Sequence, residues 1–264
     1  MSSPKLSVIL ITCNEAHNLA DCLTSLRGLA DEIVIVDSGS RDATRDIAAQ
    51  LGARVILTDD WPGFGPQKNR ALDAATGEWV LSIDADERVT PELAEEIRLA
   101  LSHNAPVAYQ IPRLSWYCGR FIRHSGWRPD HVLRLFRRDQ ARFSDDLVHE
   151  RVVVVQGVAV HTLRHDLLHY SYRDFSQVLQ KTDAYSTAAA QQAHRAGRRA
   201  SFASALLHGA WAFVRTYVLR AGFLDGAHGL ALAISNAQAS YYKYLKLWLL
   251  GQSQQAEPSD KARG

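Results

Sequence analysis

The stretch Trp79-Val80-Leu81-Ser82-Ile83-Asp84-Ala85-Asp86-Glu87 decides the fold. Its apolar part is typical of a strand buried on both faces of a parallel sheet, and ligands bind beyond the carboxyl ends of such strands. Side chains alternate along a strand, so continued pairing would place Asp84 and Asp86 on the same side. Two carboxylates there would suit Mg²⁺ or Mn²⁺, which bind a few carboxylates together with substrate phosphates. The alternative is a solvated acidic loop before the next helix.

Four such strands alternate with helical patterns in the first hundred residues, at 6–12, 33–36, 54–57 and 79–83. This alternation predicts an α/β fold with a mostly parallel, Rossmann-like sheet flanked by helices. Shorter strand candidates at 107–112, 132–136 and 152–155 predict a mixed extension of that sheet. Helical patterns at about 174–195, 200–221 and 227–250 predict a C-terminal helical extension.

The predicted elements divide the chain into three parts. We expect an α/β domain over 1–170, a basic helical region over 171–251 and a disordered tail over 252–264.

The charge of the 264-residue chain is uneven. The net charge is only +2, but residues 1–150 carry 17 Lys/Arg and 22 Asp/Glu, whereas residues 151–264 carry 13 and 6. An anionic partner for the second half is therefore expected. The cysteines Cys13, Cys22 and Cys118 show no metal-ligand spacing and are odd in number, which favours a reducing compartment. We see no signal peptide and no apolar run of the ~18–20 residues that a spanning helix needs, so we expect a cytoplasmic protein.

Polar groups follow three of the predicted strands, at Thr12-Cys13-Asn14-Glu15, Asp37-Ser38-Gly39-Ser40 and Asp84-Ala85-Asp86. All three should open on one edge of a parallel sheet, where an acid after the second strand commonly binds a ribose or base edge. The chain has neither a G-x-G-x-x-G motif after the first strand nor a G-x-x-x-x-G-K-[ST] loop. What remains is a nucleotide whose pyrophosphate is neutralised by a metal ion, which points to a nucleotide-sugar.

This ordered set of segments resembles the family 2 inverting glycosyltransferases of the GT-A fold, over roughly residues 5–155. The segments that carry the resemblance are Ser7–Thr12, Asn14-Glu15, Asp31–Thr44, Gln67-Lys68-Asn69-Arg70 and Asp84-Ala85-Asp86. Later parts of the chain resemble the subgroup that adds glucose, or a related sugar, to the inner core of lipopolysaccharide. They are Trp127, Arg134-Leu135-Phe136, Val148-His149-Glu150 and the basic helical C-terminus.

The resemblance implies that the domain over 1–170 is the nucleotide-sugar-binding and catalytic domain, and it implies roles for the matching residues. Those implied to bind the nucleotide-sugar are Thr12, Asn14, Glu15, Asp37, Ser38, Gly39, Lys68, Arg70, Asp84 and Ala85. Of these, Lys68 and Arg70 would approach the diphosphate, the alternative being a solvated helix face. Asp86 and Asp84 would hold Mg²⁺ or Mn²⁺. His169 is a candidate third ligand, or else a histidine packed in the core. Trp127, Arg128 and Arg134 would bind the acceptor, unless they only pack in loops.

An inverting transfer needs a base that takes the proton of the acceptor hydroxyl. Many relatives use an acid beyond the Asp-x-Asp motif, often in a Glu-Asp pair, and this chain departs from that pattern. It offers Asp145-Asp146 and His149-Glu150. We favour Glu150, because its segment matches the subgroup, with Asp146 second and Asp145 third.

The C-terminal region combines cations with aromatic residues. Tyr241, Tyr242, Tyr244 and Trp248, with Lys243 and Lys246, resemble an interfacial belt that would hold the enzyme on the anionic inner face of the cytoplasmic membrane. The alternative is a contact within the protein or between subunits of a homo-oligomer. Nucleic acid is not expected as a partner, because the cations are interleaved with apolar runs rather than clustered.

Together these observations predict a metal-dependent inverting glycosyltransferase. It would move a hexose, with glucose favoured and UDP-glucose as the favoured donor, to the core of lipopolysaccharide or a similar lipid-linked glycan. One alternative is a non-catalytic nucleotide- or membrane-binding module with the same fold. Another is an enzyme of the same family that acts on a different cell-envelope polysaccharide.

Overall fold

The computed structural model of the chain describes residues 5–102, 107–145 and 150–253. Most of the predicted tail, from residue 254 on, lies outside the described residues. The chain forms two compact units. The first comprises Met1–Leu114 with Pro129–Tyr170, and the second comprises Ser115–Arg128 with Ser171–Gly264.

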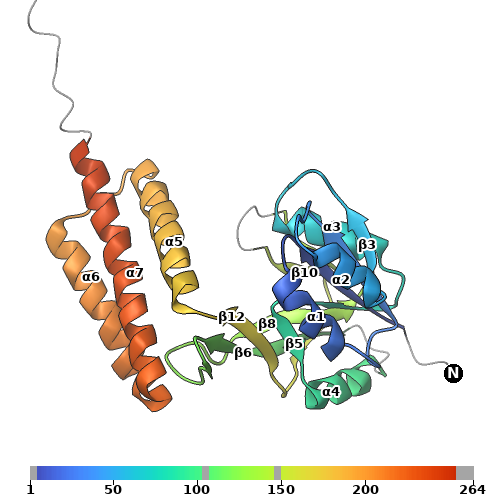
Figure 1. Cartoon of the computed structure of the whole chain (residues 1–264). Helices are drawn as coiled ribbons and strands as arrows, with labels where there is room; N and C mark the ends of the chain where they lie inside the picture. Colours follow the sequence, from blue (N-terminus) through green and yellow to red (C-terminus); the bar gives the residue numbers. More distant parts are fainter. Residues whose placement is uncertain (1–4, 103–106, 146–149, 254–264) are drawn as a thin grey trace, which may run out of the picture. The chain divides into compact units, whose positions relative to one another are not determined.

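The sheet of the first unit is built around strand β1 (Leu6–Thr12). On one side β1 pairs in parallel with β2 (Glu32–Asp37), which pairs in parallel with β3 (Arg54–Leu57). On the other side it pairs in parallel with β4 (Trp79–Ser82). Helices α1 (Ala16–Ser25), α2 (Thr44–Gln50) and α3 (Phe64–Ala74) connect these strands (Figure 1). The predicted parallel half of the sheet is confirmed.

The mixed half of the sheet begins beyond β4. There β8 (His131–Arg137) pairs antiparallel with β4, and β6 (Val107–Tyr117) pairs antiparallel with β8. Strand β11 (Ala159–Thr162) lies parallel to β6, and β12 (Leu167–Tyr172) lies antiparallel to β5 (Glu87–Val89). Strands β9 (Ala141–Phe143) and β10 (Val152–Val154) form a separate hairpin. Between β5 and β6 runs α4 (Pro91–Leu101), whose first turn is capped by the hydroxyl of Thr90.

Two apolar layers cover the two faces of the sheet. Alternate side chains of β1 belong to different layers: Val8 and Leu10 join the layer of α1 and α4, whereas Ile9 joins the layer of α3. Because β1 is buried on both faces, its sequence is a continuous apolar run rather than an alternating one. The strand ends are thereby held in one rigid framework, which positions the polar residues that follow them.

The second unit consists mainly of helices (Figure 1). They are α5 (Phe175–Arg195), α6 (Phe202–Val214), which continues as the π-helical turn η1 (Arg215–Leu219), a 3₁₀ turn η2 (Gly222–Asp225), and α7 (Gly226–Ser253). Segment 115–128, which includes the short strand β7 (Arg120–Phe121), is anchored through a cluster in which Tyr117 and Ile122 pack with Val178 and Leu232. Among the described residues, no helix is both long and apolar enough to cross a membrane.

The predicted element boundaries were correct in most places. The structure corrects three of them. Strand β4, which precedes the acidic motif, ends at Ser82, and a turn follows at Ala85 and Asp86. The strand therefore does not continue through the two aspartates. Strand β6 runs on to Tyr117 instead of ending at Pro112. The helix expected over about 200–221 is divided, because α6 ends at Val214 and the π-helical turn η1 continues it only to Leu219.

Candidate active site

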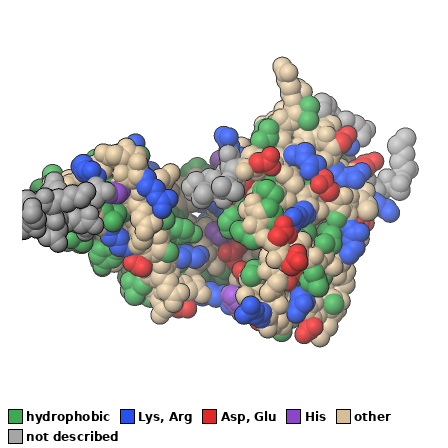
Figure 2. Space-filling model, turned by 90° about the horizontal axis from the view of Figure 1, so that it is seen from above, with side chains coloured by type: hydrophobic (Ala, Val, Ile, Leu, Met, Phe, Trp, Pro, Cys, Tyr) green, Lys and Arg blue, Asp and Glu red, His purple; other side chains and the backbone are tan. Residues whose placement is uncertain are grey.

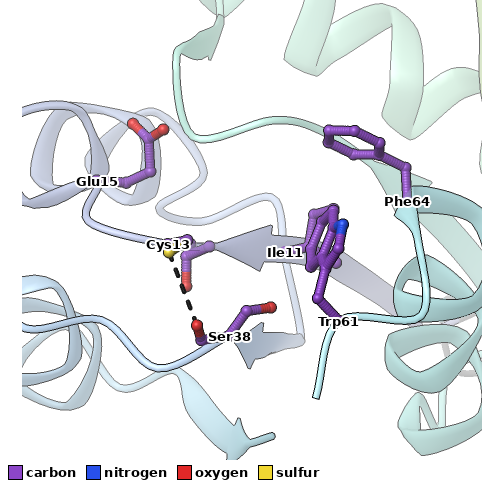
Figure 3. A pocket seen from close by; sticks show the side chains of 7 residues that line it. Ile11, Cys13, Glu15, Ser38, Trp61 and Phe64 are labelled. Carbon is purple, nitrogen blue, oxygen red and sulfur yellow. Dashed lines mark hydrogen bonds between the residues drawn. The ribbon is translucent and has the colours of Figure 1, made fainter. Parts of the chain in front are cut away.

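A pocket of about 390 Å³ opens at the carboxyl ends of β1 and β2. Figure 3 shows Cys13, Glu15 and Ser38 from the strand ends facing Trp61 and Phe64, which come from the segment before α3 and its first residue. The two aromatic rings meet edge to face with their centroids 4.9 Å apart. Apolar walls with a few polar groups are typical of a site for a small ligand, and an aromatic wall suits a planar base.

Asp37 stabilises the loops beside this pocket. Its side chain is fully buried, and its carboxylate accepts hydrogen bonds from the Thr12 hydroxyl (2.8 Å), the Ser40 amide (2.8 Å) and the Ser40 hydroxyl (2.5 Å). The Ser40 hydroxyl in turn accepts from the amide of Asn14, whose φ of 58° lies in the left-handed region. Asparagine tolerates that conformation better than most residues. Asp37 therefore joins the ends of β1 and β2, and its predicted contact with the ribose stays a prediction.

The other predicted nucleotide-binding residues surround the same strand ends. Glu15 precedes α1, and its amide donates to the Thr44 hydroxyl at 2.8 Å. The Ser38 hydroxyl accepts from Gln67 at 2.8 Å, and Gly39 adopts a positive φ of 79° that a turn requires. Arg70 is placed differently from what we expected of a diphosphate ligand. Its guanidinium makes two hydrogen bonds to Asp60, at 2.6 and 2.7 Å, on the surface.

A buried ammonium group joins two of the predicted functional carboxylates. Lys68, on α3, is only 6% exposed, and its Nζ lies 2.9 Å from Glu150 Oε1 and 3.1 Å from Asp84 Oδ1. Asp84 also accepts from Arg134 Nη2 at 2.7 Å. Burial alone would raise the pKa of Asp84, but the charges and hydrogen bonds of Arg134 and Lys68 outweigh it and hold that pKa well below the ordinary range. Asp84 is therefore ionised at neutral pH.

Glu87 is a member of this network that the sequence did not reveal. It is fully buried, accepts from Arg134 Nη2 at 2.7 Å and from the backbone amide of Asp84 at 2.8 Å, and lies 3.5 Å from Arg113. Burial raises the pKa of Glu87 even though Arg134 opposes the shift. Arg134 is one of the residues that we expected to bind the acceptor. The structure instead buries it between Asp84 and Glu87, where it fixes the orientation of both carboxylates.

Asp86 and His169 face each other on the other side of the acidic turn. Strand β12 pairs with β5 so that His169 lies opposite Glu87, and the Tyr170 amide donates to the Asp86 carbonyl at 2.8 Å. This pairing brings His169 Nε2 to 3.4 Å from Asp86 Oδ2. Over the described parts of the chain, no group of three or more His, Cys, Asp and Glu side chains is arranged to hold a metal ion. Asp84, the third predicted ligand, is directed to Lys68 and Arg134 instead.

The three residues predicted to bind the acceptor are divided between the two units. Trp127 and Arg128 belong to the second unit, whereas Arg134 belongs to the first. Trp127 packs against Tyr117 and Tyr172, with ring centroids 5.8 and 6.0 Å away, in the small apolar cluster of the second unit. Asp146, the second candidate base, lies outside the described residues.

The fold and the site define the class of the protein. A parallel sheet carries a nucleotide-sized pocket and a charged acidic turn at one edge, which is typical of enzymes that transfer a group from a nucleotide-activated donor. The sequence matches the family model of glycosyl transferase family 2 over residues 7–204. The chain therefore belongs to glycosyl transferase family 2, and it is a glycosyltransferase with a GT-A fold.

Comparison with curated proteins supports this assignment over nearly the whole chain. An uncharacterized glycosyltransferase of Rickettsia prowazekii (strain Madrid E) is 32% identical over 253 residues, covering 92% of this chain and 86% of the relative. The lipopolysaccharide core biosynthesis glycosyltransferase LpsC of Rhizobium meliloti (strain 1021) is 30% identical over 254 residues, with 92% of each chain covered. Among solved structures, S. aureus TarS aligns with a TM-score of 0.48 and 19% identity, over 63% of this chain and 36% of TarS.

Proposed function

We propose that the protein transfers a hexose, with glucose favoured, from a nucleotide-sugar to the core of lipopolysaccharide or a similar lipid-linked glycan, with inversion at the anomeric carbon. Its membership of glycosyl transferase family 2 supports the reaction class. The name of the similar LpsC protein supports a lipopolysaccharide core as the acceptor. Such an acceptor would place the reaction at the inner face of the cytoplasmic membrane.

The observation that carries the proposal is the contact of one buried lysine with Glu150 and Asp84. In the proposed reaction the acceptor hydroxyl attacks the anomeric carbon while Glu150 takes its proton. The bond from that carbon to the diphosphate oxygen breaks, and the diphosphate leaves with the electron pair. Lys68 lies 2.9 Å from Glu150, so the same cation orients the base and is available to the charge that develops on the leaving group.

The pocket beside β1 and β2 would bind the nucleotide. The rings of Trp61 and Phe64 offer the base an apolar wall, and Glu15 and Ser38 offer polar groups to the base and ribose. UDP-glucose is the favoured donor. Because Asp37 is occupied by Thr12 and Ser40, the contribution proposed for it is to hold the loops that carry these polar groups.

A divalent ion, Mg²⁺ or Mn²⁺, fits the residues on the other side of the acidic turn. One carboxylate oxygen of Asp86 and one imidazole nitrogen of His169 face each other, and both are ligand types that Mn²⁺ accepts. Two protein ligands are enough when diphosphate oxygens and water complete the coordination, as is usual for Mg²⁺ sites. When bound, the ion would neutralise the charge of the diphosphate.

A screen of nucleotide-sugars tests the proposal. The purified protein is incubated with UDP-, GDP- and ADP-sugars, with and without Mn²⁺ or EDTA, and release of free nucleotide is measured with and without lipopolysaccharide core acceptors. We expect acceptor-stimulated release that EDTA abolishes. Asp86→Ala should weaken UDP binding in Mn²⁺ by about tenfold or more, whereas Asp46→Ala, on the exposed face of α2, should not.

The possible outcomes separate the competing functions. Binding of nucleotides without turnover of any donor would identify a non-catalytic module. Transfer to another envelope polysaccharide, but not to lipopolysaccharide, would change the acceptor and keep the reaction. Full activity in EDTA would remove the metal from the mechanism.

A further inference from the structure

Helix α6 packs with its small residues inward. The positions that it and the following turn bury at helical spacing are Ala205, Gly209, Ala212 and Thr216. At Gly209 an added Cβ would come within 3.1 Å of Tyr241 Cβ, so α6 and α7 approach each other closely there. A helix that packs through small residues must place its larger side chains elsewhere.

The larger apolar side chains of this segment are exposed. Leu207 is 70% exposed, Trp211 55% and Leu219 63%. We call the α6 face the set of exposed apolar side chains Leu206, Leu207, Trp211, Val214, Val218, Leu219, Phe223 and Leu224. This is the reverse of an ordinary surface helix, which turns its large apolar side chains to the core. A contiguous exposed apolar segment of this kind marks an interaction surface.

Several side chains of the interfacial belt predicted from the sequence contact other helices of the second unit. Tyr244 stacks on His208 with ring centroids 3.8 Å apart, and Trp248 packs against Phe202 at 5.8 Å. Lys246 forms an ion pair with Asp183 at 2.7 Å. These side chains therefore hold α7 to α6 and α5. Of the fifteen large apolar side chains that are exposed among the described residues of the second unit, eight belong to the α6 face.

The charge of the second unit decides which partner fits this face. Its described residues include 12 Lys/Arg and 3 Asp/Glu. Two of those acids are engaged internally, since Asp225 is buried and accepts from the amides of Arg123 and His124, and Asp183 pairs with Lys246. Figure 2 shows apolar and basic side chains adjoining on the helical unit, with few acidic ones. A second copy would bring the same positive charge to the contact, whereas an anionic lipid surface complements it.

We propose that the α6 face inserts into the interfacial region of an anionic lipid bilayer, with Arg215 and Arg220 near the headgroups. The α6 face is apolar, and cations occur within the same segment. No described helix is long and apolar enough to cross a membrane. These are properties of monotopic helices, which lie in the plane of the membrane interface. The inference deepens the proposed function, since a lipid-linked acceptor gives the binding its purpose. The binding itself needs neither donor nor acceptor.

Vesicle flotation of the full chain tests this inference. Neutral phosphatidylcholine vesicles are compared with vesicles that contain about 30 mol% phosphatidylglycerol, at low and high salt. We expect binding to the anionic vesicles that high salt weakens, because salt screens the headgroup charge. Leu207→Asp should lower the partition coefficient by about tenfold or more, and Arg215→Glu by about fivefold or more.

Two variants on the first unit serve as matched controls. Leu99→Asp makes the same change at a leucine of α4 that is 64% exposed, and Arg45→Glu reverses an exposed charge on α2. Neither should change vesicle binding. The melting temperature of each variant shows whether it is folded. Val218→Asp, at a position 53% exposed, is the second variant of the α6 face and should repeat the effect of Leu207→Asp.

Several outcomes would overturn the inference. They are equal binding to both vesicle types, binding to neither, or equal losses in Leu207→Asp and Leu99→Asp. A dimer in sedimentation velocity that Leu207→Asp dissociates, without vesicle binding, would assign the α6 face to a second copy. Transfer to a soluble acceptor fragment is measured in parallel. If that transfer fails while vesicle binding is intact, the proposed function is refuted and the inference about the α6 face stands.

Discussion

Removal of Arg134 should destabilise the first unit more than removal of any surface arginine. Arg134 is 4% exposed and donates to Asp84 and Glu87, each at 2.7 Å. In Arg134→Met, Asp84 still forms an ion pair with Lys68 and is one-third exposed to solvent, so its charge remains largely compensated. Glu87 is fully buried and keeps the backbone amide of Asp84, at 2.8 Å, and Arg113, at 3.5 Å. Loss of the nearest cation from a buried carboxylate costs about 3–5 kcal/mol.

Arg142→Met is the matched control. Arg142 also makes two hydrogen bonds to a carboxylate, that of Asp73, but both side chains are about 60% exposed. A surface pair contributes about 0–1 kcal/mol. With a slope of about 2–3 kcal/mol per molar urea, Arg134→Met should lower the unfolding midpoint by about 1–2 M and Arg142→Met by less than about 0.5 M.

The double variant Arg134→Met/Glu87→Gln identifies the cause. If the buried charge of Glu87 is responsible, its neutralisation should restore a large part of the lost stability, and the two changes should be strongly non-additive. Urea unfolding followed by circular dichroism compares the wild type, Arg134→Met, Glu87→Gln, the double variant and the control Arg142→Met. Equal midpoint shifts for the two arginine variants would refute the reasoning, as would a double variant no more stable than Arg134→Met.

Two further predictions concern single groups. Burial alone would raise the pKa of Glu32, but hydrogen bonds from Ser7 and Thr76 outweigh this effect and lower it. The ionised carboxylate therefore stabilises the folded protein at neutral pH. Glu32→Gln should lower the free energy of unfolding by about 1–2 kcal/mol above about pH 5. This difference from the wild type should shrink as the pH falls from about 4.5 through the pKa of Glu32 in the folded protein. A difference that grows on acidification would contradict the prediction. Cys13 is exposed and lines the pocket, whereas burial raises the pKa of the Cys22 thiol, so a thiol reagent at about pH 8 should label Cys13 and spare Cys22. UDP at about ten times its Kd should slow the labelling of Cys13 about tenfold, as measured by mass spectrometry; an unchanged rate would place the nucleotide elsewhere.

The sequence predicted the elements whose residues are buried in a regular pattern. Strands β1, β2 and β4 are continuous apolar runs because helices cover both their faces, and α4 has a cap and an apolar face. The strand-end motifs followed from the parallel sheet. Strand β11 could not be predicted in this way, because all four of its residues are exposed and leave no hydrophobic pattern.

The residues missed at the candidate site lack any local signal. Trp61 and Phe64 lie in a Pro/Gly-rich segment that reads as a simple connection, and only the fold brings their rings to the ends of β1 and β2. Glu87 reads as one more acid of the turn, and its burial depends on Arg134, which is 47 residues away along the chain. The exposure of the α6 face depends on which side of α6 packs against α7. Both sides of α6 are apolar, one with small and one with large residues, so the hydrophobic pattern alone does not identify the buried side.

The most direct test of the proposed mechanism is the effect of Glu150→Gln on turnover and on donor binding. Glutamine keeps the size of the side chain and can still accept a hydrogen bond from Lys68, but it cannot take the acceptor's proton. We expect turnover to fall by about 10²–10⁴-fold while the affinity for UDP and the nucleotide-sugar stays within about threefold of the wild type. Asp146→Asn should leave turnover largely intact. A collapse of turnover in Asp146→Asn, with Glu150→Gln close to the wild type, would contradict the assignment of Glu150 as the base.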